Sequence, residues 1–398
     1  MIIRSKKKRK TARQIVMISV LIAVIAVAAI IGRFLPQNMA DYYSSEIFPL
    51  ISSLPQKLNS MTRVSLSEIA VVVLICIVPP VVIVWLVLFI KKALGRGLGR
   101  FLYKSLRNIL AVSMVLLIIF EMMHGINFRR TPARTMLGLG RDKISFEDYC
   151  AAFEWSFRGM EAARKELKED DKGVAKLSTG FDEMAEYASG IIDTFCASYG
   201  ISRYESNAVP KSVRLSHYWS YTYVIGMYNP FFGETNINTD YMDVTTVPMT
   251  VCHELFHAKG FANETDCNLI GTFACITSDR ADFRYCGYLN IFITLLNQIE
   301  VLMRTKGFEY DFPMTNEDLI PFARDVQAAN EYWLSIDKEV LDIQKKLGIN
   351  ITEKATEVNN NFLKSNGEKE GVDSYNVPEN EYVAFYLMYF ANGGKRNA

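Results

Sequence analysis

The segment VCHELFHAKGFANETDCN, residues 251 to 268, contains two histidines and a glutamate in the order His-Glu-x-x-His. If the segment is helical, His253 and His257 share one face, because residues four apart on a helix lie one above the other. Two imidazoles so placed can bind one metal ion, and Glu254 beside the first can take a proton from a metal-bound water. The chain has only four histidines, so this spacing favours a zinc site over coincidence.

A catalytic zinc also needs a third protein ligand and an open position for water. Gly260 can end the first helix and reverse the chain, and Glu264 then falls in the first turn of a second helix. Asn268 lies four residues past Glu264 and therefore on the same face. We predict Glu264 as the third zinc ligand and Asn268 as the outer partner that orients a histidine. Asp266 is the alternative ligand, and its other interpretation is a helix cap.

Four further residues are candidates for stabilising an oxyanion or binding substrate. His217 is the only other histidine after residue 127, and it can act in this way or be an ordinary strand histidine. Arg284, Tyr285 and Tyr288 can donate to an oxyanion, but core or surface positions explain them equally well.

Three apolar runs occupy the first third of the chain, at residues 15–32, 69–90 and about 106–126. They predict transmembrane helices at about 13–35, 68–90 and 106–126, because a bilayer core needs roughly 20 apolar residues. The first run exceeds the apolar length of a cleavable signal peptide, so we expect an uncleaved anchor. Glu121 and His124 end the third run, where we expect them at the membrane interface.

Basic residues near the runs predict the orientation of the chain. Residues 4–10 and the expected loop 91–107 each hold six lysines and arginines, whereas residues 36–66 hold only Lys57 and Arg63. The N-terminus and the second loop are therefore predicted to be cytoplasmic, and everything from residue 128 onward extracytoplasmic. Seven cysteines without a C-x-x-C pair permit disulfides in that compartment but do not require them.

The rest of the chain has the mixed composition of a globular domain, and a net charge of +1 gives no indication of nucleic-acid binding. Ser145 is a predicted helix N-cap, Gly200 a predicted helix end, and a metal-site helix is expected from Val247 or Pro248 to Gly260. Aromatic and β-branched residues at 214–228 predict a strand, and ETNIN at 234–238 a second strand at the sheet edge. The polar stretch 359–376 predicts a mobile loop, and PENEYVAFYLMYFA (378–391) a closing helix.

These elements predict a multi-pass α-helical membrane N-terminus (1–127) followed by a soluble domain (128–398). The soluble domain is expected to be mainly α (α+β) and zincin-like, with a small antiparallel sheet. The length of 398 residues accommodates both parts.

The segments GMYNPFFGETNIN, PMTVCHELFHAKGFANETDCN and FRYCGYLN resemble the bacterial membrane proteins of the DUF3810 family. In that family an acidic cluster ending in Glu-Ala-Asn follows the His-Glu-x-x-His motif, whereas this chain has Asp266 and Cys267 before Asn268. The pattern is more distantly similar to gluzincin peptidases, whose Glu-x-x-x-Asp supplies a ligand and its outer partner. The resemblance implies a bacterial cytoplasmic membrane and a zinc-hydrolase site, without a named reaction.

The leading hypothesis is a membrane-anchored zinc metallopeptidase with Zn²⁺ as cofactor, Glu254 as general base, and a peptide or protein as substrate. The first alternative is a non-catalytic membrane scaffold or sensor with a structural or degenerate zinc site. The second alternative is a zinc hydrolase of a non-peptide substrate or cell-wall amide. An open or closed fourth coordination position distinguishes catalytic from structural zinc.

Overall fold

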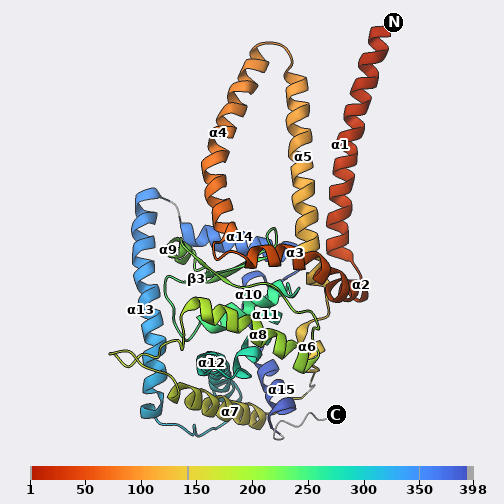
Figure 1. Ribbon diagram of the computed structural model, residues 1–398. Helices are drawn as coiled ribbons and strands as arrows, with labels where there is room; N and C mark the ends of the chain where they lie inside the picture. The colour runs from red at the N-terminus through yellow and green to blue at the C-terminus, as the bar shows by residue number, and fades with distance from the viewer. Residues whose placement is uncertain (1, 141–142, 349, 392–398) are drawn as a thin grey trace.

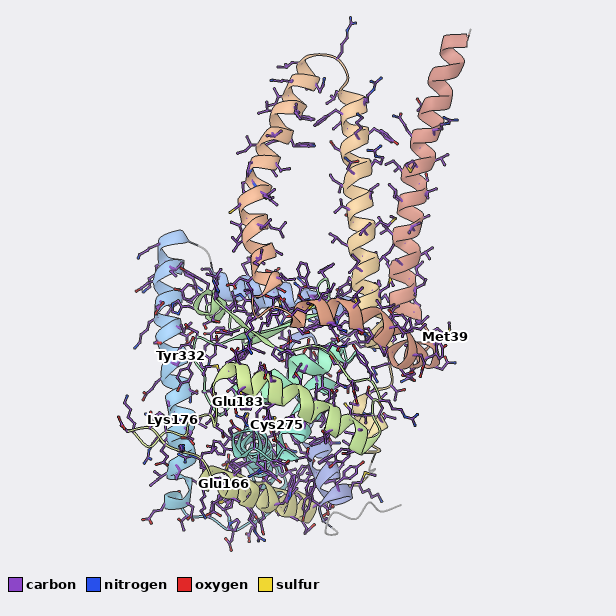
Figure 2. The ribbon with its side chains drawn as sticks, in the orientation of Figure 1. Met39, Glu166, Lys176, Glu183, Cys275 and Tyr332 are labelled. Carbon is purple, nitrogen blue, oxygen red and sulfur yellow. The ribbon has the colours of Figure 1, made fainter. Side chains whose placement is uncertain are left out.

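Three long helices rise from one side of a helical body (Figure 1). The computed structural model describes residues 2–140, 143–348 and 350–391. The three helices are α1 (Ile2–Phe34), α4 (Leu66–Leu94) and α5 (Leu98–Met123). Their apolar side chains point outward into open space along most of their length, whereas the side chains of the body fill its interior (Figure 2).

The three predicted apolar spans are confirmed as helices. Among the described residues, four helices are long and apolar enough to cross a membrane, and the fourth is α12 (Ala281–Lys306). The most apolar window of α12 is 44% buried, against 11%, 0% and 6% for α1, α4 and α5. The apolar residues of α12 therefore contribute to the core of the body, where this helix packs against α7 (Phe146–Lys165) and α11 (Glu264–Ile276). Helices α1, α4 and α5 indicate a membrane protein.

The expected cytoplasmic loop 91–107 is mostly helical. Helix α4 continues to Leu94 and α5 begins at Leu98, so only Gly95, Arg96 and Gly97 join them. Gly97 has a φ of 103°, a left-handed conformation that glycine adopts without the steric cost of a Cβ atom. The basic residues extend the two helices because nothing in their sequence stops helix formation before the glycines.

The chain between α1 and α4 is also helical and packs on the body. It forms α2 (Gln37–Tyr42), a π-helical turn (Tyr43–Ile47) and α3 (Phe48–Ser60). The N-terminus of α4 is fixed by buried Glu234, whose carboxylate accepts hydrogen bonds from the amides of Leu66 and Ser67 at 3.0 and 2.9 Å. Lys211 neutralises the same carboxylate at 2.8 Å. A helix N-terminus favours an anion, so this contact anchors a membrane helix to the sheet.

The helices of the body begin and end largely where the sequence predicts. Helix α7 (Phe146–Lys165) has the predicted Ser145 cap, and α8 (Phe181–Tyr199) ends at Gly200. The polar stretch 359–376 was predicted to be a mobile loop, and this is wrong, because Asn350 caps a helix that continues to Asn366. The other helices are α6 (Ala133–Met136), α13 (Asn316–Leu347), α14 (Ile351–Asn366), α15 (Glu379–Tyr389) and the 3-10 turns Gly125–Arg129 and Gly371–Tyr375.

A three-stranded sheet covers one side of the metal-site helix within the described residues. Its order is β1 (Lys211–Val213), β3 (Glu234–Asn238), β2 (Gly226–Asn229). The β2–β3 pair is antiparallel as expected, but β1 pairs with β3 in parallel, so the sheet is mixed. ETNIN is therefore the central strand, and the prediction that it forms the edge is wrong. The predicted strand 214–228 is also wrong over its first part, because Ser216–Ser220 forms the short helix α9.

All seven cysteines lie in the described part of the chain, and each is a free thiol there. Cys275 lies in the interior of the body (Figure 2), with its sulfur 3.8 Å from that of Cys252. This separation is nearly twice the roughly 2.0 Å of a disulfide bond.

Candidate metal site

Helix α10 (Val247–Ala258) carries the His-Glu-x-x-His motif through the centre of the body. All but one of its residues are buried, as expected for a core helix. The helix stops because Gly260 takes a φ of 83°, which favours glycine. The carbonyl of Ala258 accepts a hydrogen bond from Gln56 Nε2 at 2.8 Å, so α3 satisfies one of the free acceptors at this helix end.

Helix α11 (Glu264–Ile276) returns directly across α10. Asn263 caps it by accepting a hydrogen bond from the amide of Asp266 at 3.0 Å, which places Glu264 in the first turn. The two helices approach closely at Gly271, where a Cβ atom would lie 3.4 Å from the backbone nitrogen of His253. This close crossing brings the first turn of α11 to the histidine face of α10.

The side chains of His253, His257 and Glu264 converge as one buried group that could hold a metal ion. The two Nε2 atoms are 3.0 Å apart, and Glu264 Oε2 lies 3.0 Å from His253 Nε2 and 3.4 Å from His257 Nε2. A tetrahedral ion with bonds of about 2.0–2.1 Å separates its ligand atoms by about 3.3 Å. The three observed separations lie close to that value, so the geometry fits a zinc-sized ion.

The outer nitrogens of both imidazoles donate to oxygen acceptors. His253 Nδ1 lies 2.7 Å from Asn268 Oδ1, and His257 Nδ1 lies 2.8 Å from the carbonyl of Phe261. Asn268 is oriented in turn, because its Nδ2 donates to the carbonyl of Tyr375 at 2.6 Å. In neutral imidazoles the Nε2 atoms therefore carry lone pairs that point at one another and at the Glu264 carboxylate. A proton or a metal ion among these acceptors would stabilise such an arrangement.

The pKa values of His257 and Glu264 also indicate that positive charge is favoured within the cluster. Burial alone would lower the pKa of His257 and raise that of Glu264. The interactions with Cys267 and with the Glu264 carboxylate instead raise the pKa of His257 well above its usual range. The two histidines hold the pKa of Glu264 well below its usual range. Both shifts mean that positive charge among the three ligand atoms is stabilising, and a metal ion can contact all three where a proton joins only two.

Glu254 lies beside this cluster with its carboxylate enclosed. It is 5% exposed, and its Oε2 has no hydrogen-bond partner among the described residues. Strand β2 passes directly over it, because a Cβ atom at Gly226 would lie 2.5 Å from Glu254 Oε1. Burial raises the pKa of Glu254, against the opposing effect of the two histidines. A buried carboxylate with a raised pKa and a free oxygen is suited to accept and return a proton.

His124 and Tyr228 also reach the cluster, which the sequence did not indicate. The ring of His124 lies 5.5 Å from that of His257 and 5.8 Å from that of Tyr228, between centroids. His124 is 6% exposed, because the chain turns into the body at the end of α5, so its side chain is enclosed by protein just after a candidate membrane span. Burial lowers the pKa of His124 to about 3. Its Nδ1 and the Tyr228 hydroxyl both lack partners among the described residues.

The structure places the other predicted site residues elsewhere. Asp266 points to α6, where it accepts a hydrogen bond from the amide of Ala133. Both ring nitrogens of His217 are used, by Asp240 at 2.8 Å and Glu339 at 3.0 Å. The three predicted donors on α12 also have partners away from the cluster. Arg284 donates to Glu166, Tyr285 donates to Asp325, and the ring of Tyr288 packs on Trp155.

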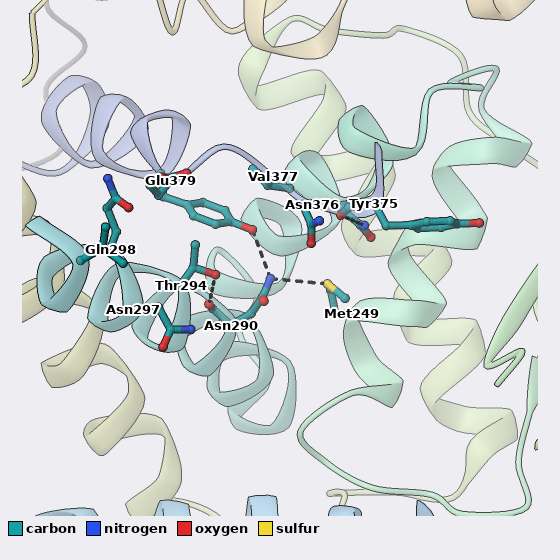
Figure 3. Close-up of a pocket in the computed structure, with 12 residues that line it drawn as sticks. Met249, Asn290, Thr294, Asn297, Gln298, Tyr375, Asn376, Val377 and Glu379 are labelled. Carbon is teal, nitrogen blue, oxygen red and sulfur yellow. Dashed lines mark hydrogen bonds between the residues drawn. The ribbon is translucent and has the colours of Figure 1, made fainter. Parts of the chain in front are cut away.

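A cavity of about 490 Å³ adjoins the cluster on the side of Asn268 and Tyr375. Tyr375 lines this cavity and also contacts the cluster, since its ring lies next to that of His253, with centroids 6.3 Å apart. The carboxamides of Asn290, Asn297 and Asn376 line the cavity together with Glu379 (Figure 3). The volume lies within the range of small-ligand pockets, and its lining offers both donors and acceptors.

The chain has helices that can cross a membrane and a body in which two histidines and two glutamates meet. These features define a membrane protein with a candidate metal centre. Over residues 43–378 the chain matches the family described as Protein of unknown function (DUF3810), and it belongs to that family. The predicted family is thereby confirmed, and the match covers α4, α5 and the cluster. No curated protein and no solved structure matches the chain.

Proposed function

We propose that this protein is a membrane-anchored zinc metallopeptidase. One observation carries the proposal: two imidazole nitrogens and one carboxylate oxygen converge at zinc-ligand spacing, beside the buried carboxylate of Glu254, whose Oε2 has no hydrogen-bond partner among the described residues. A purely structural site has no use for a buried carboxylate with one free oxygen next to the ligands, because an unsatisfied polar atom is costly to bury.

His253, His257 and Glu264 would hold the ion in this proposal, and Asn268 would orient His253 through its Nδ1. Bound zinc would supply a water of lowered pKa and would polarise a carbonyl. Glu254 takes the proton from that water and delivers it to the leaving nitrogen, for which its raised pKa is suited. His124 and Tyr228 face the cluster with unpartnered polar atoms and are our candidates for stabilising an oxyanion.

Two features favour a peptide over another amide. Strand β2 is an edge strand, it passes over Glu254 at Gly226, and the amide of Tyr228 donates to the Glu254 carboxylate. An edge strand can align an extended peptide by main-chain hydrogen bonds. The cavity next to His253 is lined mainly by uncharged carboxamide and hydroxyl groups, which complement a peptide main chain.

The test uses the full chain in lipid nanodiscs. We expect about one zinc per chain in both the wild type and Glu254→Gln, and cleavage of a quenched fluorescent peptide library by the wild type alone. Removing the general base is expected to lower turnover at least 100-fold while leaving zinc content unchanged. Zinc without turnover in the wild type would favour a scaffold or sensor with a structural zinc site, and turnover on a cell-wall amide alone would favour the non-peptide hydrolase. A wild type that does not bind zinc would refute both hydrolase hypotheses and leave the scaffold or sensor with a degenerate site.

A further inference from the structure

Helix α3, which lies between the membrane helices α1 and α4 in the sequence, exposes an apolar stripe. Leu50 is 79% exposed and Leu54 is 64% exposed. The members of the stripe are Leu50, Leu54 and Leu58 of α3, together with Ile47 at the end of the preceding π-helical turn and Met61 at the C-cap. With 3.6 residues per turn, the three leucines fall within roughly 80° of the helix circumference. The stripe is therefore one continuous face and not a scatter of single exposed residues.

The opposite face of α3 is the one that packs on the body. Phe48, Ser52, Gln56 and Asn59 are 5% exposed or less. Three of these are polar and bonded: Gln56 donates to the carbonyl of Ala258, Ser52 bonds Tyr204, and Asn59 donates to the carbonyl of Phe232. The usual arrangement of a surface helix is reversed here, since its polar side is buried and its apolar side points away from the core.

The position of α3 indicates what covers the stripe. The helix lies across the base of α4 and α5, on the side of the body from which all three long helices rise (Figure 1). The chain reaches α3 from α1 through α2 and the π-helical turn and continues from α3 to α4, and the apolar surfaces of α1 and α4 are themselves exposed. The stripe is therefore continuous with the surface that faces lipid. Lys57 lies beside the stripe and is exposed, where a long basic side chain reaches the headgroups.

We propose that α3 lies in the plane of the membrane interface, with its leucine stripe inserted at the boundary between headgroups and acyl chains. The partner of this surface is the lipid leaflet next to the body. Interfacial helices bury their apolar face by about 5–10 Å in this boundary. The inference depends neither on zinc nor on turnover.

The placement of α3 also brings the metal cluster near the membrane. Gln56 joins α3 directly to the last turn of α10, which carries His257. The cluster therefore lies near the face of the body that carries the stripe, close to the proposed membrane surface. If the proposed peptidase function holds, the substrate is a polypeptide segment close to a membrane.

The experiment measures depth in the bilayer at single labelled positions of the full chain. In a Cys76→Ser background the other six cysteines are 9% exposed or less, so an environment-sensitive fluorophore can be placed on Leu54→Cys. Lys176→Cys is the matched control, because it is exposed on a part of the body far from the long helices (Figure 2). Both proteins are reconstituted in nanodiscs with and without lipids brominated in the acyl chain.

We expect a blue-shifted emission at position 54 and at least twofold stronger quenching by brominated lipid than at position 176. Label at Ser60→Cys, on the flank of α3, should give an intermediate value. Equal quenching at positions 54 and 176 would overturn the proposal. So would a blue shift without bromine quenching, because that result assigns the stripe to a contact between copies of the chain. Zinc content measured on the same samples separates these outcomes from any failure of the metal site.

Discussion

Replacing Glu264 by glutamine tests the candidate metal site at one atom. Glu264 Oε2 lies 3.0 Å from His253 Nε2 and 3.4 Å from His257 Nε2, and it accepts no hydrogen bond within the described residues. Glutamine keeps the shape of the side chain but removes the charge and adds two N–H donors. The variant therefore changes the ligand and little else in the packing.

The expected loss of zinc affinity follows from the number of ligands. Four-ligand zinc sites bind with roughly 10–16 kcal/mol, or about 2.5–4 kcal/mol per ligand. Since about 1.4 kcal/mol corresponds to a factor of ten, Glu264→Gln should weaken zinc binding about 100- to 1000-fold. The two histidines remain oriented by Asn268 and Phe261, so residual binding is expected.

The assay is a competition for zinc against a chromophoric chelator, with thermal unfolding of the metal-free proteins as a check on folding. Glu368→Gln is the matched control: Glu368 is also a buried carboxylate, it bonds Asn263 at the start of the same helix, and it lies outside the ligand group. Burial, followed by the charge of Glu264, raises the pKa of Glu368 to about 7. Its replacement should change affinity less than tenfold. Equal affinities of wild type and Glu264→Gln would refute Glu264 as a ligand.

Three further predictions follow from single contacts. Asn268→Leu should weaken zinc binding about 10- to 100-fold, because Asn268 orients His253; a competition titration showing no loss would count against this role. Glu234→Ala should lower the free energy of unfolding by about 3–5 kcal/mol in denaturant titrations, because Lys211 loses its buried partner. A variant with nearly the wild-type free energy of unfolding would contradict this prediction. Burial raises the pKa of Asp266 to about 7, so the folded protein holds a proton that the unfolded chain releases near pH 4. The free energy of unfolding of the metal-free protein should therefore decrease as the pH rises from about 4 to about 7. Asp266→Asn should make this decrease smaller, and the same pH dependence in wild type and variant would exclude the buried carboxyl as its source.

Local signals in the sequence predicted most of the helices. Ser145, Gly200 and Gly260 mark helix ends correctly, since caps and left-handed glycines act through their immediate neighbours. Strand predictions were poorer. The aromatic segment around His217 forms the short helix α9, and β3 lies in the middle of the sheet. Strand order depends on which segments pair across the fold, and sequence spacing carries little of that information.

The amino-acid sequence alone determined which side chains of α10 and α11 share a face, because the rise and turn of a helix fix the positions i and i+4. The pair His253 and His257 was therefore predictable from spacing alone, whereas Glu264 of α11 was predicted as the third member with Asp266 as the alternative, and the structure brings His253, His257 and Glu264 together. Only the tertiary structure decided that His124, more than a hundred residues away in the sequence, lies beside His257. It also decided that the polar face of α3 is buried and its leucines exposed. Both depend on how the membrane helices dock on the body, and that docking is set by contacts between segments far apart in the chain.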